Sequence, residues 1–157
     1  MKRDRIANEK IINFHIPAAR AIGTSASAIF DLRAGTPVVG AAGSGAGREI
    51  NTNILLALQI GGDWAAAGTI NVRVFTGNTV VTLSLYATGA QCLGTEGDIL
   101  YLFELRDLQR YIRVDLVIAG ATCLCSMLGS ADRSRREPVY QAGTEKAITY
   151  SKNPASF

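Results

Sequence analysis

The segment Arg106–Gly120 constrains the fold more than any other part of the chain, because it alternates apolar and polar residues over the length of a long strand. The even positions are apolar: Ile112, Val114, Leu116 and Ile118. The odd positions between them are Tyr111, Arg113 and Asp115. Since successive side chains of a strand point to opposite faces, this pattern predicts a half-buried β-strand. The segment holds no catalytic constellation, which favours a structural or binding module over an enzyme.

Further strands are predicted at spacings of about ten to fifteen residues, with no convincing helix between them. The best hairpin joins Thr69–Thr76 to Thr79–Tyr86 through Gly77-Asn78. The other predicted strands are Ala28–Leu32, Glu49–Ile60, Asp98–Leu105, Arg110–Ile118 and Thr122–Leu128. A chain of 157 residues suffices for one domain. We therefore predict an all-β fold, a β-sandwich or jelly roll.

The strand pattern divides the chain into a body and two extended arms. We expect an N-terminal arm over residues 1–26, a β-sandwich body over 27–129 and a C-terminal arm over 130–157. Within the first arm, Ile11–Pro17 alternates and ends at a proline, as an extended arm or an edge strand does. The Gly- and Ala-rich stretch Gly35–Gly47 is typical of a loop.

The basic charge of the chain lies in the two arms. The net charge is +3, with +3 in residues 1–20, +2 in residues 131–157 and −2 in the remainder. The total is too small to predict specific nucleic-acid binding, but basic arms suit an acidic or polar partner surface. The candidate binding residues of the arms are Lys2, Arg3, Arg5, Lys10, Arg133, Arg135, Arg136, Tyr140, Lys146, Tyr150, Lys152 and Phe157.

No motif predicts catalysis, a cofactor or a metal. Gly40–Gly47 lacks the Lys-Ser or Lys-Thr of a phosphate loop, and a predicted strand follows it instead of a helix. Cys123 and Cys125 share one face of a strand, but no second pair completes a zinc site, so buried cysteines are expected. His15 is the only histidine and lies in the predicted arm, a poor position for a general base.

No secretory signal is expected, because polar residues follow the N-terminal Met-Lys-Arg-Asp-Arg. No window approaches 18 uninterrupted apolar residues, so no membrane span is expected. The three cysteines do not make a complete disulfide framework and fit a reducing compartment. Trp64 is the only tryptophan, which is a weak signal for a carbohydrate platform.

Two segments carry a resemblance to a known family. Arg110-Tyr-Ile-Arg-Val114, within the strand that ends at Gly120, is similar to a "RYLRL" strand followed by a glycine turn. Ala66-Ala-Gly-Thr-Ile-Asn-Val72 is similar to a "GAGT-x-N-V" strand start. In these features, over roughly residues 27–129, the chain resembles the cement, or decoration, proteins of tailed-bacteriophage capsids.

The resemblance implies a jelly-roll-like structural protein of the virion that binds an assembled phage capsid and clamps neighbouring major capsid proteins. It also implies a homo-oligomer, a dimer or a trimer, on the capsid exterior, with the host cytoplasm as its location during assembly. The alternative is a virion receptor-binding or tail module that recognises host carbohydrate, which a glycan array would distinguish. An enzyme on a jelly-roll scaffold ranks last.

Overall fold

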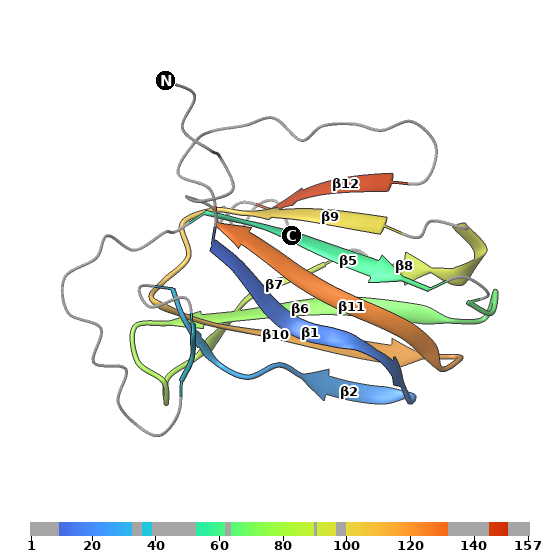
Figure 1. The fold of residues 1–157 in the computed structure, drawn as a ribbon, viewed down its shortest axis with the longest axis horizontal. Coiled ribbons are helices and arrows are strands. Elements are labelled where there is room, and N and C mark those ends of the chain that lie inside the picture. Colours follow the sequence, from blue (N-terminus) through green and yellow to red (C-terminus); the bar gives the residue numbers. More distant parts are fainter. Residues whose placement is uncertain are drawn as a thin grey trace.

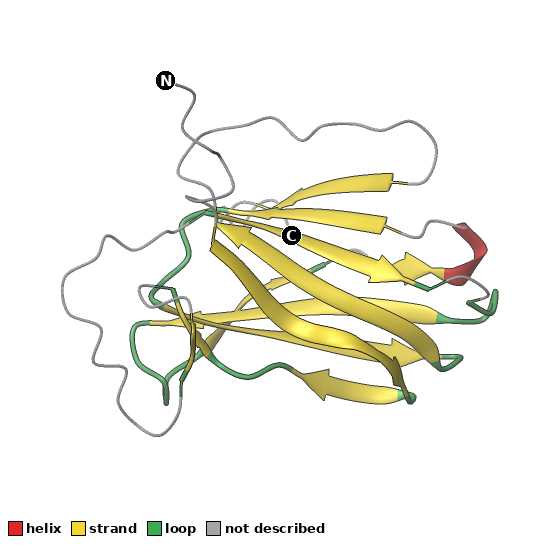
Figure 2. Ribbon diagram, viewed as in Figure 1, coloured by secondary structure: helices red, strands yellow, loops and turns green. Residues whose placement is uncertain are grey.

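A computed structural model of the chain describes residues 10–32, 36–38, 53–61, 64–89, 91–96, 100–131 and 145–150. The chain folds into two β-sheets packed face to face, which confirms the predicted all-β sandwich (Figures 1 and 2). A single turn of 3-10 helix, Gly94–Glu96, interrupts the strands of this described part. The strands are β1 (Lys10–Arg20), β2 (Gly23–Ala26), β3 (Phe30–Asp31), β4 (Thr36–Pro37), β5 (Ile54–Ile60), β6 (Thr69–Gly77), β7 (Ser84–Thr88), β8 (Cys92–Leu93), β9 (Leu100–Leu105), β10 (Tyr111–Ala119), β11 (Cys123–Ala131) and β12 (Glu145–Tyr150).

The first sheet has five strands in the order β1-β11-β5-β9-β12. Its pairs are antiparallel, except that β12 runs parallel to β9. The second sheet has the order β4-β3-β10-β6-β7, with β2 also paired to β10 and β8 to β6. Strand β10 is thus flanked on both sides, by β6 on one edge and by β2 and β3 on the other.

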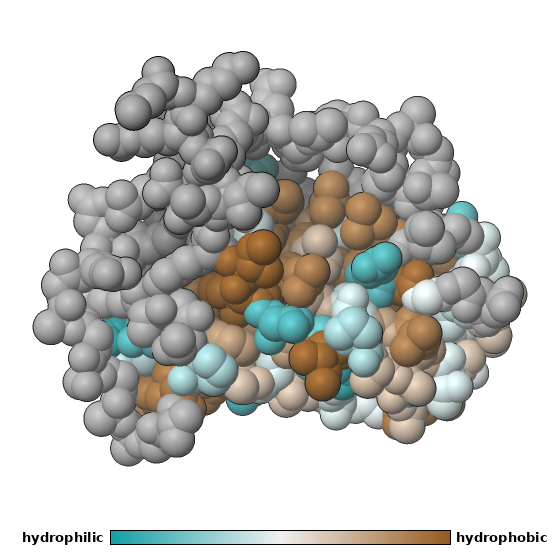
Figure 3. Space-filling model, viewed as in Figure 1, coloured by the Kyte–Doolittle hydropathy of each residue, from teal (hydrophilic) through white to brown (hydrophobic). Residues whose placement is uncertain are grey.

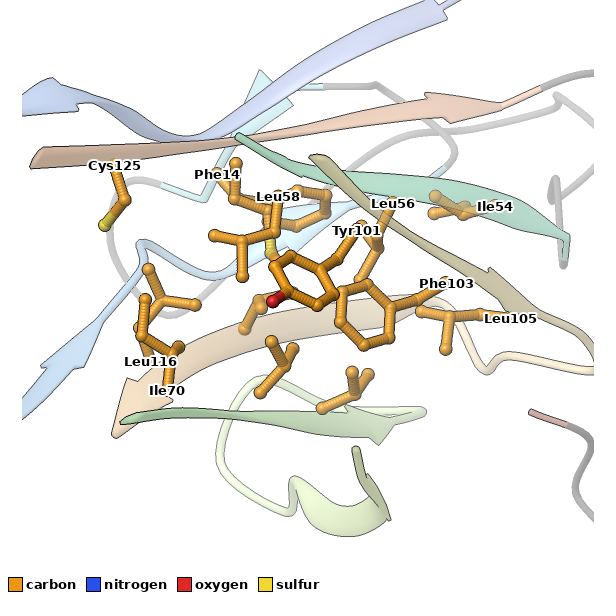
Figure 4. Close-up of a cluster of buried hydrophobic side chains, with 14 of the residues drawn as sticks. Phe14, Ile54, Leu56, Leu58, Ile70, Tyr101, Phe103, Leu105, Leu116 and Cys125 are labelled. Atoms are coloured by element: carbon orange, nitrogen blue, oxygen red, sulfur yellow. The ribbon is translucent and has the colours of Figure 1, made fainter. Parts of the chain in front are cut away.

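The core lies between the two sheets and is filled by alternate residues of their inner faces (Figure 4). Side chains of β5 and β9, such as Leu58, Tyr101 and Phe103, point toward Ile70 and Leu116 of the second sheet. The predicted apolar face of β10 belongs to this core, because its four even residues are at most 1% exposed. Burial of such side chains contributes roughly 1.5–3 kcal/mol each.

The other face of β10 is less exposed than the alternation predicted. Tyr111 and Asp115, expected on an open polar face, are only 5% and 6% exposed. The prediction of a half-buried strand is therefore wrong for these two residues. Arginines of the same segment explain the difference, since Arg113 binds the Asp115 carboxylate and Arg110 lies over the Tyr111 ring at 5.0 Å.

The N-terminal segment forms an edge strand of the first sheet and part of the core. Strand β1 pairs with β11, and Ile12 and Phe14 are buried. Gly129 makes room for the aromatic ring, because a Cβ there would come within 2.6 Å of Phe14 Cε2. The prediction of a separate arm over residues 1–26 is therefore wrong from Lys10 onward, and the sandwich is larger than 27–129.

The C-terminal boundary of the body also differs from the predicted one. Ser130 and Ala131 belong to β11, and Glu145–Tyr150 pairs with β9 as β12. A short strand that pairs with residues 45 positions earlier in the chain leaves little local signal, which explains why the sequence pattern stopped at Gly129. Residues 1–9, 132–144 and 151–157, like the Gly-rich segment 40–47, lie outside the described residues.

The predicted hairpin of β6 and β7 is present, but its second strand begins later than expected. Thr76 pairs with Ser84, so Thr79–Leu83 belongs to the connection and not to the strand. The hydroxyl groups of Thr79 and Thr82 hydrogen-bond to each other within this connection. Such local bonds compete with strand pairing and explain the misplaced start.

Candidate functional site

The chain enters and leaves the first sheet at one end. The strand pairings place the start of β1 beside the end of β11, and the start of β5 beside the ends of both β11 and β9. The end of β12 lies beside the end of β9. Lys10, Ala131 and Tyr150 therefore lie at a single end of the sheet (Figure 1), whereas Glu145, the first residue of β12, lies at the opposite end beside Leu100. We call the first of these ends the docking end.

Of the twelve predicted binding residues, three lie in described strands. Lys10 is the first residue of β1, and Lys146 and Tyr150 belong to β12. The pairing thus brings Lys10 and Tyr150 to the same end of the sheet. The remaining nine lie outside the described residues: Lys2, Arg3, Arg5, Arg133, Arg135, Arg136, Tyr140, Lys152 and Phe157.

The outer face of the five-stranded sheet is a second candidate surface, which the sequence analysis did not single out. Its register across β1, β11, β5 and β9 places mostly apolar side chains on the side away from the core. Figure 3 shows apolar atoms gathered over these strands. The outer face consists of Ile11, Asn13, Leu124, Ser126, Leu128, Ser130, Leu55, Ala57, Gln59, Leu100, Leu102 and Glu104.

Charge is nearly absent from this outer face. Within β1, β11, β5 and β9, Glu104 is the one ionisable side chain of this face, and Arg106 pairs with it at 2.7 Å. The register of β12 adds one acidic position, Glu145, beside Leu100. Three of its large apolar residues are well exposed: Ile11 at 67%, Leu124 at 54% and Leu128 at 39%. The sequence held a signal for it, because Ile54–Leu58 is a continuous apolar run, and a strand with one solvent face would alternate.

The outer face of the second sheet is different, because ion pairs dominate it. Arg113 binds the Asp115 carboxylate with two hydrogen bonds of 2.9 and 3.1 Å, and its guanidinium lies over the Phe75 ring at 4.4 Å. The guanidinium of Arg110 binds the Asp31 carboxylate at 2.8 Å, and this hydrogen bond raises the pKa of Arg110. These charges satisfy one another, so we interpret this network as structural.

His15 connects the two sheets. Its Nε2 donates a hydrogen bond of 2.9 Å to the carbonyl of Val114, which also accepts the backbone N–H of Ser27 at 2.9 Å. Burial lowers the pKa of His15 below its ordinary value, the bond to Val114 opposes this, and the charge of Arg20 lowers it further. The imidazole is therefore neutral at pH 7 and holds β1 against β10.

We expect the free energy of unfolding to fall as the pH is lowered below about 6.5, the pKa of an unfolded histidine. The native pKa is lower, so the unfolded state binds the proton more readily below that pH. Urea unfolding at pH 7.5 and pH 5.5 measures the loss. His15→Gln, whose amide can still donate to Val114, is expected to show a smaller dependence than the unaltered protein. An equal dependence in the variant would contradict the assignment.

The two cysteines of β11 face the core, as the alternation predicted. Cys123 and Cys125 are both buried and both free. A hydrogen bond with Cys123 and the nearby charge of Arg20 lower the pKa of Cys125 to about 7, while the same bond and burial raise that of Cys123. Across the residues that the structure describes, no three His, Cys, Asp or Glu side chains gather as metal ligands would.

Trp64 is packed against the core and is not an exposed platform. The indole is partly buried, and Gly68 lies so close that any Cβ would overlap with Trp64 Nε1. Stacking on a sugar ring needs an accessible aromatic face. Separately, no helix within the described ranges has the length and apolar character of a membrane span.

The fold and its surfaces define an all-β sandwich that has one mostly apolar outer face and in which β1 begins and β12 ends at the same end of one sheet. No family model matches the sequence, and no curated protein is similar to it.

Proposed function

We propose that this chain is a structural virion protein that binds and stabilises an assembled phage capsid by clamping neighbouring major capsid proteins. It would act as a homo-oligomer on the capsid exterior, without catalysis and without a cofactor. The convergence of the chain at the docking end carries this proposal, because the basic segments 1–9 and 151–157 and the start of segment 132–144 are attached there, at Lys10, Tyr150 and Ala131.

The physical basis is linkage and multivalency. A protein that binds the closed lattice but not loose capsid subunits stabilises the lattice by mass action. Several weak contacts made from one rigid body add up to strong binding through their effective concentration. Basic segments that share one end of the sandwich can reach neighbouring subunits of one capsid at the same time. The resemblance of Arg110–Val114 and Ala66–Val72 to capsid cement proteins supports the same function.

A capsid-binding assay with a charge variant of one basic segment tests the proposal. Replacing Arg133, Arg135 and Arg136 together by serine is expected to lower occupancy on capsids that lack this protein by tenfold or more, since three attractive charges are lost. Occupancy is measured by co-sedimentation and by imaging of the particles. Raising the salt concentration should weaken binding of the unaltered protein by screening the same charges.

Arg73→Ser is the control, because Arg73 is an exposed arginine in the middle of β6, which belongs to the second sheet and not to the sheet of the docking end. It is expected to keep full occupancy. Full occupancy of the triple variant, or equal binding to capsids and to loose subunits, would contradict the proposed function.

A further inference from the structure

We propose that the outer face of the five-stranded sheet packs against the same face of a second copy of this chain. The inference rests on the self-association included in the proposed function and assigns a surface to it. It does not depend on capsid binding.

Exposed apolar area on this face favours a covered state. Ile11, Leu124 and Leu128 remain between 39% and 67% exposed, and Leu55, Ala57 and Leu102 between them are only partly buried. A contiguous apolar patch on a sheet marks an interaction site more often than a free surface. Removing it from water contributes about 25 cal/mol for each Å².

The polar groups on the face favour a second copy of this chain as the partner. They are the amides of Asn13 and Gln59 and the hydroxyls of Ser126 and Ser130, all of which both donate and accept hydrogen bonds. Such groups can pair with their own copies across a twofold axis, whereas a set of like charges would repel its copy. Within β1, β11, β5 and β9, the face offers no unpaired charge to an acidic or a basic partner, because its single carboxylate, Glu104, is already paired with Arg106.

The edge beside this face is protected against another mode of association. Strand β1 is the edge of the sheet, and its register shifts twice, between Asn13 and His15 and between His15 and Ala18. Pro17 within the second shift has no N–H to donate. Proline and bulges block the addition of a strand at an edge. Stacking of faces, and not extension of the sheet at β1, is therefore the favoured contact.

The size of the face predicts a weak dimer. Four strands about 4.8 Å apart and about seven residues long span roughly 19 Å by 24 Å, or about 900 Å² for two copies together. Specific, stable interfaces bury about 1,200–2,000 Å², so this contact lies below that range, among the weak interfaces. A second copy is expected to bind reversibly, with contacts on the capsid adding to the interface strength.

Sedimentation equilibrium on the purified full chain tests this inference. The average mass is expected to rise from that of the 16.7 kDa monomer toward twice this value between about 10 μM and about 1 mM. Leu128→Glu, and separately Leu124→Glu, are expected to weaken the dimer at least tenfold, because each would bury an unpaired charge. Both positions point away from the core, and thermal unfolding of each variant checks that it is folded.

Val81→Glu is the matched control, since Val81 is an 86% exposed apolar residue in the connection between β6 and β7. It is expected to dimerise like the unaltered protein. A chain that stays monomeric at about 1 mM, or dimers that survive both leucine changes or are equally lost in the control, would overturn the inference. Loss of capsid binding in Leu128→Glu without any self-association would overturn it in favour of a capsid contact. Failure of the arginine variant on capsids would instead concern the proposed function alone.

Discussion

Deletion of residues 1–26 is expected to prevent the chain from folding. The deletion removes β1 and β2, and with them Ile12 and Phe14 from the core and the His15 bond to Val114. Loss of a buried phenylalanine alone costs about 3–5 kcal/mol, and the buried isoleucine adds about 1.5–3 kcal/mol. These losses approach the whole stability of a domain, which is about 5–15 kcal/mol. Circular dichroism and a thermal melt measure the outcome.

Deletion of residues 1–9 is the matched control, because it keeps every described strand. This shorter chain is expected to show a cooperative transition close to that of the full chain. A folded 27–157 fragment with an unchanged melting temperature would instead support the separate arm that the sequence suggested.

Gly120→Ala is expected to be the most damaging of the single substitutions that we consider. Gly120 turns the chain from β10 into β11 at a φ of +75°, which costs a residue with a side chain about 1–3 kcal/mol. A Cβ at this position would also overlap with the backbone oxygen of Ala67, so that a neighbouring turn must move. We expect a loss clearly above 3 kcal/mol in urea unfolding, because both effects act together.

Gly23→Ala separates these two effects. Gly23 also has a positive φ, +133°, but a Cβ there would meet no atom within 4 Å. It is expected to show the conformational cost alone, about 1–3 kcal/mol. Equal losses at the two glycines would mean that the contact with Ala67 contributes nothing.

Periodicity predicted much of the fold. The alternation of β10, the hairpin of β6 and β7 and the shared face of Cys123 and Cys125 depend on neighbours in the chain, and each is present. The membership of β1 in the core depends on space that Gly129 provides for Phe14, more than a hundred residues away. The parallel pairing of β12 with β9 is equally non-local, and no local pattern encodes it.

The candidate surfaces were predictable to different degrees. Composition alone located the basic residues in the terminal segments, but not their convergence, which depends on how β1, β11 and β12 are arranged in one sheet. The continuous apolar run Ile54–Leu58 is typical of a strand covered on both faces. Only the register shows that one of these faces points away from the core.

The arrangement of the chain ends also determines where a peptide or label can be attached to the protein. A peptide fused to either terminus would be held at the docking end, where it would compete with a partner for space. The corner between β1 and β2 lies at the opposite end of the sheet, and its residues Ala21 and Ile22 are exposed. An epitope or fluorophore inserted between them would project away from the partner, which makes the sandwich a display scaffold with separate faces for attachment and presentation.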